Sequence, residues 1–430
     1  MTYKEAIEYI HSVKWMGSRP GLSRITELCR RMGNPEDFLR FIHVAGTNGK
    51  GSFCCMLSSV LCSAGYKTGL FTSPFVESFN ERIMLDGHEI SNEELAEATS
   101  EVKLHAELME DKPTEFELIT AIALLYYKKK KCDFVILEAG LGGRLDSTNV
   151  IKNSEISVIT GIDLDHTTIL GDTTAKIAEE KAGIIKEGCP VLFGEGDDDA
   201  FDVIKKTAKE KNSPFYITDY SAITDVESDL SGSVFTADGE RFKISLVGQY
   251  QIKNSANVIK AVRILRSRGI EISNEAMHDG LASAKWKARF EVLSKDPLVI
   301  YDGAHNPQGI AGAVSNIKFY LSPLSPDGKI ILLMGVMADK DHRKMIKMLS
   351  PFASTVFCVT PENARSLDSA GVHYEFGECG VRGEAFDSIE NGVFSAVRSA
   401  EKERKPLLCL GSLYMYADVK ESIMRYLAEK

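Results

Sequence analysis

The sequence lacks the features that mark membrane and secreted proteins. No apolar run is long enough to span a bilayer, and the first residues, Met1–Glu5, include no apolar segment of the kind found in a signal peptide. Acidic residues outnumber basic ones, and the formal net charge of −10 argues against a general binder of nucleic acid or anionic membranes. We therefore expect a cytoplasmic protein without nucleic-acid or membrane partners. A local basic pocket for an anionic ligand stays possible.

Paired cysteine motifs are also missing. The chain has nine cysteines, an odd number, and no two are spaced as a Cys-x-x-Cys pair. Several lie within apolar helix or strand patterns, where a thiol behaves as a small apolar side chain. We interpret them as reduced core thiols, which fits a cytoplasmic protein.

A chain of 430 residues is too long for one ordinary core, and we expect two domains, residues 1–285 and 286–430. In the first, short apolar runs typical of buried strands alternate with helical patterns, which predicts a doubly wound α/β fold. Residues 222–247 instead alternate polar and apolar positions and predict a small antiparallel patch. After Trp286, a second series of strands and helices predicts a smaller, Rossmann-like α/β domain. The expected strands are 41–45, 67–72, 134–138, 156–162, 191–194 and 215–218, followed by 298–301, 330–334, 355–359 and 407–410.

The strongest local signal is a glycine-rich segment between an expected strand and an expected helix. It runs from Gly46 to Ser52 with the sequence Gly-Thr-Asn-Gly-Lys-Gly-Ser. Glycines allow a tight turn that presents backbone N–H groups, while Lys50, the hydroxyls of Thr47 and Ser52 and the helix N-terminus attract a polyphosphate. The spacing departs from the standard Walker pattern, because Val44 stands where that pattern has glycine. The alternative is ordinary turn chemistry.

Polar residues also follow three other expected strands of the first domain. They are Ser73, Glu138 and the segment Asp163–His166. Ligands of an open parallel sheet collect at the carboxyl ends of its strands, and a carboxylate beside a phosphate loop suits Mg²⁺. The alternative for Glu138 is an ion pair with Arg144. A lone histidine such as His166 is more often structural than a ligand.

In the second domain, the strand ending at Tyr301 leads into Asp302, His305 and Asn306. These side chains could contact a ribose or orient a nucleophile. The alternative is ordinary helix capping by Asn306, which is compatible with the first reading. Arg289 lies close to the expected domain boundary and could reach a nucleotide held by the other domain.

Six motifs occur together and in order along the chain. They are HVAGTNGKGS (43–52), Ser73-Pro74, EAGLGGRLDSTN (138–149), DLDHTTILGDTTAKIAEEKAGII (163–185), DGAHNP (302–307) and Gly411-Ser412-Leu413-Tyr414. Together they resemble folylpolyglutamate synthase, including its bifunctional dihydrofolate synthase form, within the Mur ligase superfamily. The glycine loop alone indicates only the superfamily, whereas the 138–149 stretch with DGAHNP is much more specific.

The resemblance implies an ATP-dependent amide ligase with a P-loop-type N-terminal ATPase domain and a smaller C-terminal α/β domain. ATP would phosphorylate the γ-carboxylate of a folate, and the amino group of L-glutamate would attack the acyl phosphate and release phosphate. The implied cofactors are ATP and a pair of Mg²⁺ ions, and the implied setting is folate biosynthesis and one-carbon metabolism. We expect a monomer whose partners are small molecules: folate or dihydropteroate, L-glutamate and ATP.

The resemblance also implies residue roles. Lys50, a carbamylated Lys181 and His305 would serve catalysis, with His305 and Ser412 near the incoming glutamate. The implied metal ligands are Ser73, Glu138 and His166. The implied nucleotide-binding residues are Gly46, Thr47, Asn48, Gly49, Lys50, Gly51, Ser52, Asn254, Arg289 and Asp302. The implied folate-binding residues are Arg19, Pro20, Gly21, Leu22, Phe116, Glu117, Leu145, Asp146 and Ser147.

Three departures from the family pattern stand out. Gly248-Gln249-Tyr250-Gln251 replaces the usual Gly-x-His-Gln, Lys287-Ala288-Arg289 replaces Pro-Gly-Arg, and Tyr416-Ala417-Asp418 replaces Val-Gly-Glu. None removes a charged group assigned above, so we expect ligase activity to survive.

Other functions fit part of the pattern. A dihydrofolate synthase that adds only the first glutamate, onto dihydropteroate, uses the same chemistry. A Mur-type ligase for a UDP-linked peptide fits less well, because 138–149 and DGAHNP follow the folate pattern. Outside the class, a non-catalytic ATP-binding regulatory protein would leave His166, Lys181 and the Asp302–His305 cluster without a purpose.

Overall fold

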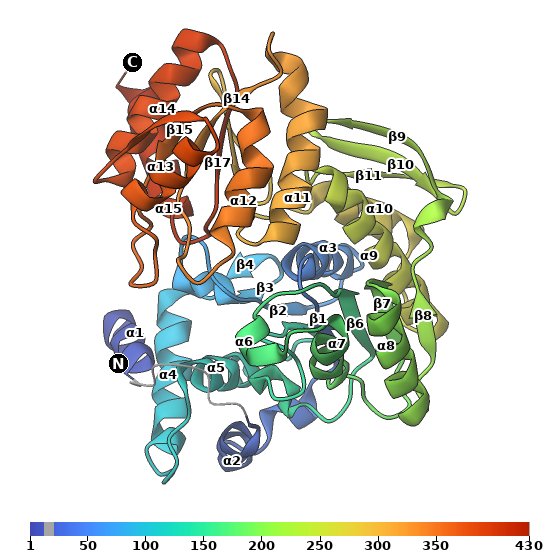
Figure 1. Cartoon of the computed structure of the whole chain (residues 1–430). Coiled ribbons are helices and arrows are strands. Elements are labelled where there is room, and N and C mark those ends of the chain that lie inside the picture. Colours follow the sequence, from blue (N-terminus) through green and yellow to red (C-terminus); the bar gives the residue numbers. More distant parts are fainter. Residues whose placement is uncertain (13–20, 430) are drawn as a thin grey trace. The chain divides into compact units, whose positions relative to one another are not determined.

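A computed structural model of the chain describes residues 1–12 and 21–429 (Figure 1). The chain forms two compact units, of which the first comprises residues 1–224, 236–242 and 253–284. The second comprises residues 225–235, 243–252 and 285–430. The chain therefore passes between the units several times, and one of these passages falls within helix α9 (Gln249–Ser267), whose first turn groups with the second unit.

An eight-stranded sheet forms the centre of the first unit, in the order β4-β3-β2-β5-β1-β6-β7-β8. The six strands from β2 to β8 in that order are parallel, and β3 and β4 form an antiparallel edge. Its strands are β1 (Phe41–Ala45), β2 (Thr68–Phe71), β3 (Ile83–Leu85), β4 (His88–Glu89), β5 (Phe134–Glu138), β6 (Ile156–Gly161), β7 (Val191–Glu195) and β8 (Phe215–Ile217). β1 and β5 are buried along their whole length, because helices cover both faces of the sheet.

Helices pack on the sheet through residues of alternate strand positions. Val135 and Leu137 of β5 belong to one core cluster with α5 (Glu115–Lys130), and Ala45 and Ile159 belong to another with α7 (Thr174–Ala182). Figure 1 shows α3 (Lys50–Ser63) on the other side of the sheet from α5 and α7. The remaining helices of this unit are α1 (Tyr3–Ser12), α2 (Ser23–Arg31), α4 (Asn92–Ala106), α6 (Thr167–Leu170), α8 (Asp198–Glu210), most of α9, and α10 (Asn274–Ser283). The predicted doubly wound α/β fold is confirmed.

The second unit contains a six-stranded sheet in the order β12-β13-β17-β14-β15-β16. Only β12 runs antiparallel to its neighbour. The strands are β12 (Glu291–Lys295), β13 (Leu298–Asp302), β14 (Ile330–Met334), β15 (Ala353–Cys358), β16 (Arg382–Ala385) and β17 (Leu407–Leu410). The helices are α11 (Pro307–Asn316), α12 (His342–Leu349), α13 (Ser369–Glu378), α14 (Ile389–Glu403) and α15 (Tyr416–Ala428). The expected smaller α/β domain is therefore present.

A third sheet of three strands, β11-β10-β9, forms where the sequence predicts a small patch; its strands are β9 (Ile223–Asp229), β10 (Gly232–Ala237) and β11 (Glu240–Ile244). Every cysteine of the described residues is a free thiol, and most are buried, as expected for core thiols. In residues 1–12 and 21–429, we find no helix with the length and apolarity that crossing a bilayer requires.

Candidate functional site

The glycine loop connects β1 to α3 at the centre of the first sheet. β1 lies between β5 and β6, so the loop emerges beside the carboxyl ends of both neighbours. Gly49 has a φ of 84°, and a Cβ there would lie 2.6 Å from Asn254 Oδ1 of α9. A Cβ at Gly46 would lie 2.0 Å from Thr160 Oγ1. Glycine is therefore required at both positions. Asn254, which the family resemblance assigns to the nucleotide, lies against the loop at Gly49.

Thr47 and Thr160 tie this loop to β6. Thr47 donates its N–H to Gly161 O (2.8 Å) and its hydroxyl to the Asp163 carbonyl oxygen (3.0 Å). Thr160 donates its hydroxyl to Asn48 O (2.7 Å). Our sequence analysis missed Thr160, because it looks like an ordinary β-branched strand residue and only the folded sheet places it against the loop.

Two lysines converge on the first glycine of the loop. Lys50 Nζ donates to the carbonyl oxygens of Gly46 (3.0 Å) and Thr47 (3.3 Å), and Lys181 Nζ, from α7, donates to Gly46 O (2.8 Å). Lys181 is only 4% exposed. Its burial, and next the positive charge of Lys50, lower the pKa of Lys181 to about 7. A buried lysine that is partly neutral near pH 7 is a possible nucleophile as well as a cation.

The family resemblance implies that Ser73, Glu138 and His166 bind a metal ion. Ser73 follows β2 and donates its backbone N–H to Glu138 Oε2 (3.3 Å), so the structure brings these two residues together. Glu138 is buried at the end of β5. His166 directly precedes α6, its side chain is about half exposed, and its backbone N–H donates to Asp165 Oδ1 (2.8 Å).

This donor set suits one kind of metal. In the described part of the chain, no group of three or more His, Cys, Asp or Glu side chains is arranged to hold an ion. A carboxylate and a hydroxyl are hard oxygen donors, and Mg²⁺ completes such a partial shell with water and substrate phosphates. The residues present therefore fit Mg²⁺ held jointly with a nucleotide.

The segment after Glu138 interlocks with α7. Arg144 donates its N–H to Glu180 O (2.7 Å), and its guanidinium forms an ion pair with the Glu180 carboxylate. Asn149 Nδ2 donates to both Arg144 O and Gly183 O, and each distance is 3.0 Å. A Cβ at Gly183 would lie 2.3 Å from the Arg144 Cβ, so only glycine fits. The ion pair of Arg144 is thus with Glu180, which the sequence did not suggest.

Several residues assigned to folate already make contacts within the protein. Asp146 accepts hydrogen bonds from Leu141 N (2.9 Å) and from the N–H and hydroxyl of Thr148 (3.0 and 2.6 Å). Thr148 Oγ1 in turn lies 2.8 Å from His43 Nε2. Asp146 therefore shapes its own loop, while the neighbouring Leu145 is exposed.

Glu117 is similarly engaged. Its Oε2 accepts hydrogen bonds from Thr114 N (2.7 Å) and from Arg24 Nε (2.9 Å), and both charged side chains are buried. Our sequence analysis missed Arg24, because nothing in α2 distinguishes it from a surface arginine. Phe116 lies against Gly140, where a Cβ would come within 2.6 Å of the ring. Of the remaining assigned positions, Gly21 and Leu22 precede α2, Ser147 is buried, and Arg19 and Pro20 lie outside the described residues.

The second unit places its assigned residues at the carboxyl ends of β13 and β17, which are adjacent and pair Asp302 with Leu410. Asp302 accepts hydrogen bonds from Ala304 N (2.9 Å) and Tyr250 OH (2.9 Å). Its burial raises the pKa of Asp302 to about 6, against the opposing effect of Arg289. Arg289 itself lies between two residues of left-handed backbone, at φ 55° and 49°.

His305, Asn306 and Ser412 complete this edge. In the neutral ring of His305, Nδ1 donates to Gly303 O (2.7 Å), so Nε2 carries the lone pair. Asn306 caps α11 by accepting from Gly309 N (2.7 Å), which confirms the capping alternative. Ser412 is buried, and its Oγ accepts from Tyr414 N (3.1 Å).

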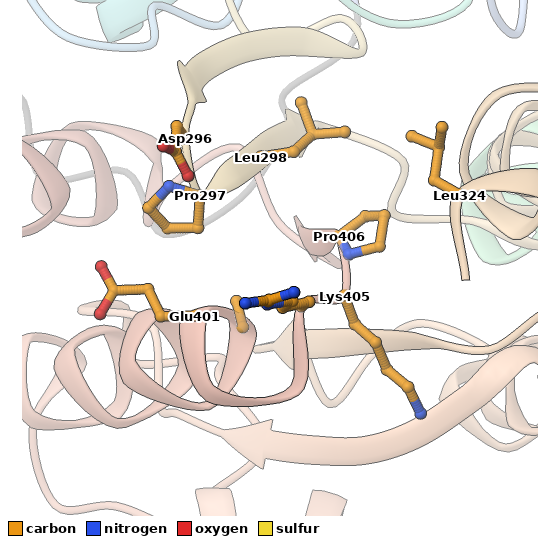
Figure 2. Close-up of a pocket in the computed structure, with 9 residues that line it drawn as sticks. Asp296, Pro297, Leu298, Leu324, Glu401, Lys405 and Pro406 are labelled. Carbon is orange, nitrogen blue, oxygen red and sulfur yellow. The ribbon is translucent and has the colours of Figure 1, made fainter. Parts of the chain in front are cut away.

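A pocket of about 520 Å³ lies at the other end of this sheet. It is lined by residues at the amino ends of β13 and β17 and at the end of α14, among them Asp296, Pro297 and Pro406 (Figure 2). Figure 2 shows Lys405 pointing away from Asp296 and Pro297, and Lys405 Nζ donates to Asp327 instead (2.8 Å). This pocket contains none of the residues assigned from the sequence.

Comparisons with known proteins agree with the fold. Two family models match: "Mur ligase middle domain" over residues 44–262 and "Mur ligase, glutamate ligase domain" over residues 288–413. A Bacillus subtilis protein named dihydrofolate synthase/folylpolyglutamate synthase is 36% identical over 98% of this chain and 99% of its own. Folylpolyglutamate synthase of Lacticaseibacillus casei is 35% identical over 99% of each chain.

Solved structures give the same result. The structure described as "E.coli FolC in complex with DHPP and ADP" has a TM-score of 0.87 and 29% identity, and the match covers 99% of this chain and 98% of the other. The structure described as "FPGS-AMPPCP-folate complex" has a TM-score of 0.86 and 33% identity, covering 99% of this chain and all of the other. The chain therefore belongs to the folylpolyglutamate synthase/dihydrofolate synthase family of Mur ligases.

Proposed function

We propose that this protein is an ATP-dependent ligase that joins L-glutamate to the γ-carboxylate of a folate through an acyl phosphate. The observation that carries the proposal is the convergence of Lys50 and Lys181 on the phosphate loop beside Glu138. A relative that is 36% identical over almost the whole chain bears the matching name, and a related structure is described with an ATP analogue and folate. Family membership makes the protein an ATP-dependent ligase.

In the proposed reaction, the first unit holds the polyphosphate. The N–H groups of the glycine loop and the Lys50 ammonium would face the transferring phosphoryl group, where positioning and charge stabilisation supply most of the rate. Mg²⁺, when bound by Ser73, Glu138 and His166, would neutralise part of the phosphate charge. We expect a pair of such ions, as the family resemblance implies.

Lys181 is proposed to carry a carbamate. With a pKa of about 7, an appreciable part of Lys181 is neutral near pH 7, and only the neutral amine attacks CO₂. The ammonium first loses one proton, and a second proton leaves nitrogen as the N–C bond to CO₂ forms, so a buried cation becomes an anion with the release of two protons. That anion would relieve the repulsion between Lys181 and Lys50 and offer oxygen to a metal ion.

The second unit would receive the amino acid. His305 follows β13 and Ser412 follows the adjacent β17, and the family resemblance leads us to assign both to the incoming glutamate. Arg289 and Asp302, with Asn254 of the first unit, are assigned to the nucleotide. The domain limits 1–285 and 286–430, a monomeric state, a cytoplasmic location and the folate contacts near Phe116 and Leu145 remain predictions of the sequence.

Dihydrofolate synthase is the second candidate function, with dihydropteroate as the acceptor. Relatives favour it as well: the Bacillus subtilis name includes both activities, and a Saccharomyces cerevisiae relative that is 31% identical over 93% of this chain is named dihydrofolate synthetase. Both acceptors use the same chemistry, so the two functions are compatible in one site. A purely regulatory ATP-binding protein would have no use for His305 and Ser412.

The experiment is an acceptor comparison. Purified protein, Mg-ATP and labelled L-glutamate are offered either dihydropteroate or a reduced folate monoglutamate. Incorporation with the monoglutamate supports the main proposal, and incorporation with both supports a bifunctional enzyme. Incorporation with dihydropteroate alone selects the second candidate, and ATP binding without incorporation into either acceptor refutes the ligase assignment.

A further inference from the structure

The carboxylate of Asp302 is fixed by a residue to which the sequence analysis gave no role. Tyr250 OH donates to Asp302 Oδ2 (2.9 Å), and Ala304 N donates to Oδ1 (2.9 Å). Asp302 is only 3% exposed. A carboxylate has about four lone-pair sites, so each oxygen keeps capacity for a ligand donor. The two bonds set its orientation without using that capacity.

Tyr250 is itself held firmly. A Cβ at Gly248 or Gly312 would lie 3.3 or 3.2 Å from the tyrosine ring, so two glycines make room for it. The next residue along from Gly248, Gln249, donates its N–H to Asn316 Oδ1 (2.9 Å) and its side-chain amide to Tyr320 OH (3.1 Å). Ring and backbone are therefore both fixed against α11 and the turn that follows it.

We propose that Tyr250 is the positioning residue for Asp302, whose carboxylate it orients and keeps ionised to accept hydrogen bonds from the ribose hydroxyls of the nucleotide. The inference rests on the proposed function, which assigns Asp302 to the nucleotide. Position 250 is where this chain departs from the histidine of the family pattern. A phenol donates one hydrogen bond and stays neutral through the neutral pH range, whereas a histidine would titrate there.

The charges around Asp302 give the direction of the effect. Arg289, before β12, favours the carboxylate, while burial raises the pKa of Tyr250 and of Tyr301 of β13, so both phenols are neutral near pH 7. From β17, the residue paired with Asp302 is Leu410, which carries no charge. Burial raises the pKa of Asp302 to about 6, and the hydrogen bond from Tyr250 opposes that rise. Loss of the hydroxyl therefore raises the pKa of Asp302 further into the neutral range.

The test is Tyr250→Phe, which removes one oxygen atom and keeps the ring. The Kd of a non-hydrolysable ATP analogue with Mg²⁺ is measured across pH by calorimetry, together with kcat and KM for ATP. We expect the acid side of the binding and kcat/KM profiles to move to higher pH by roughly one unit, with KM rising more than kcat falls. At high pH the variant should approach the wild type.

Two further variants make the result specific. Tyr126→Phe also removes a phenol that donates to a carboxylate, Glu94 Oε2 at 3.2 Å, and should leave both profiles unchanged. Tyr250→His restores a donor, and we expect it to recover part of the lost affinity. If Tyr250→Phe does not fold, Tyr250→His takes its place: because a histidine donor titrates in the neutral range, the pH dependence of analogue binding should change, and a profile identical to that of the wild type would overturn the inference.

The outcomes separate the two claims. If the wild type binds the analogue but forms no amide, the proposed function fails, and the binding profiles still test Tyr250. If Tyr250→Phe and the wild type show the same pH dependence of analogue binding, the inference is overturned, whatever the ligase activity.

Discussion

Lys50 and Lys181 donate hydrogen bonds to the same acceptor, the carbonyl oxygen of Gly46, over 3.0 and 2.8 Å. The two ammonium groups repel each other across this oxygen. Lys181 is buried, so its ammonium is also separated from water. Burial of Lys181, and next the positive charge of Lys50, lower the pKa of Lys181 to about 7. The charge state of Lys181 can therefore change near neutral pH.

The first prediction concerns stability. The pKa of Lys181 is about 7 in the folded protein, against an ordinary value of 10.5. Between pH 7 and pH 10.5 the unfolded chain therefore binds more protons than the folded protein. Below pH 7 both states carry the charge, and the free-energy penalty for burying it is fully present. In CO₂-free buffer below pH 7, Lys181→Met should raise the free energy of unfolding by about 1–3 kcal/mol. The gain should shrink as the pH rises toward 10.5. Urea unfolding at several pH values measures it, and equal destabilisation at every pH would contradict the account.

The second prediction concerns the carbamate. With ¹³C-labelled bicarbonate, a carbamate carbon signal should appear in the wild type and disappear in Lys181→Met. Lys186 is a matched control, because it is a half-buried lysine whose pKa is likewise lowered by burial, to about 8, and its ammonium donates to Asn149 Oδ1 (2.7 Å). A signal that persists in Lys181→Met and is lost in Lys186→Met would place the carbamate on Lys186 and contradict the assignment to Lys181.

The third prediction separates backbone strain from crowding in the phosphate loop. Gly49 and Gly65 both have a φ of 84°, but a Cβ at Gly65 meets nothing within 4 Å, whereas one at Gly49 lies 2.6 Å from Asn254 Oδ1. Each alanine variant should lose about 1–2 kcal/mol of stability from strain alone. Only Gly49→Ala should also raise the KM for ATP, by roughly tenfold, the equivalent of about 1.4 kcal/mol. A similar rise in the KM for ATP in Gly65→Ala would contradict the assignment of the glycine loop to ATP binding.

The fourth prediction concerns Glu117, which the sequence assigned to folate. Its carboxylate is buried against Arg24, so Glu117→Ala leaves the buried Arg24 with only the more distant and half-exposed Asp111 (3.6 Å) as a carboxylate partner in an ion pair, and should cost about 3 kcal/mol of unfolding free energy. The double variant Arg24→Met, Glu117→Leu should recover most of that loss. If Glu117 contacts folate directly, the KM for folate should rise in the double variant although stability returns. An unchanged KM would assign Glu117 to structure alone.

Much of the first unit could be predicted because its signals are local. The apolar run of β5 and the glycines after β1 are visible in a few consecutive residues, and the resemblance to the family linked them to Ser73 and Lys181. Thr160 and Arg24 could not be found in this way. Each gains its role only from a partner far along the chain, Asn48 for Thr160 and Glu117 for Arg24.

The organisation of the second unit shows the same limit. Residues 225–235 and 243–252 group with it although they precede Trp286, and no change in composition marks them. Tyr250 drew attention only as a departure from the family pattern. Its hydrogen bond to Asp302 spans 52 positions of sequence, so no local pattern could have predicted it.

The fifth prediction concerns the metal and phosphate positions. Lys50→Ala and Glu138→Gln should each abolish turnover while leaving the circular dichroism spectrum and the unfolding midpoint close to those of the wild type. The hydrogen bonds of Lys50 to Gly46 O and Thr47 O lie within its own loop, and Gln keeps the shape of Glu138 without its charge. Near-normal activity in either variant would refute the role assigned to that residue.

The central claim, transfer of phosphate to the folate carboxylate, has a direct isotopic test. A folate whose γ-carboxylate carries ¹⁸O is turned over with ATP and L-glutamate, and the released phosphate is analysed by mass spectrometry. An acyl phosphate intermediate keeps one carboxylate oxygen on phosphorus when the amine displaces it, so the account predicts phosphate with one ¹⁸O atom for each amide bond formed. Amide formation with unlabelled phosphate would contradict it.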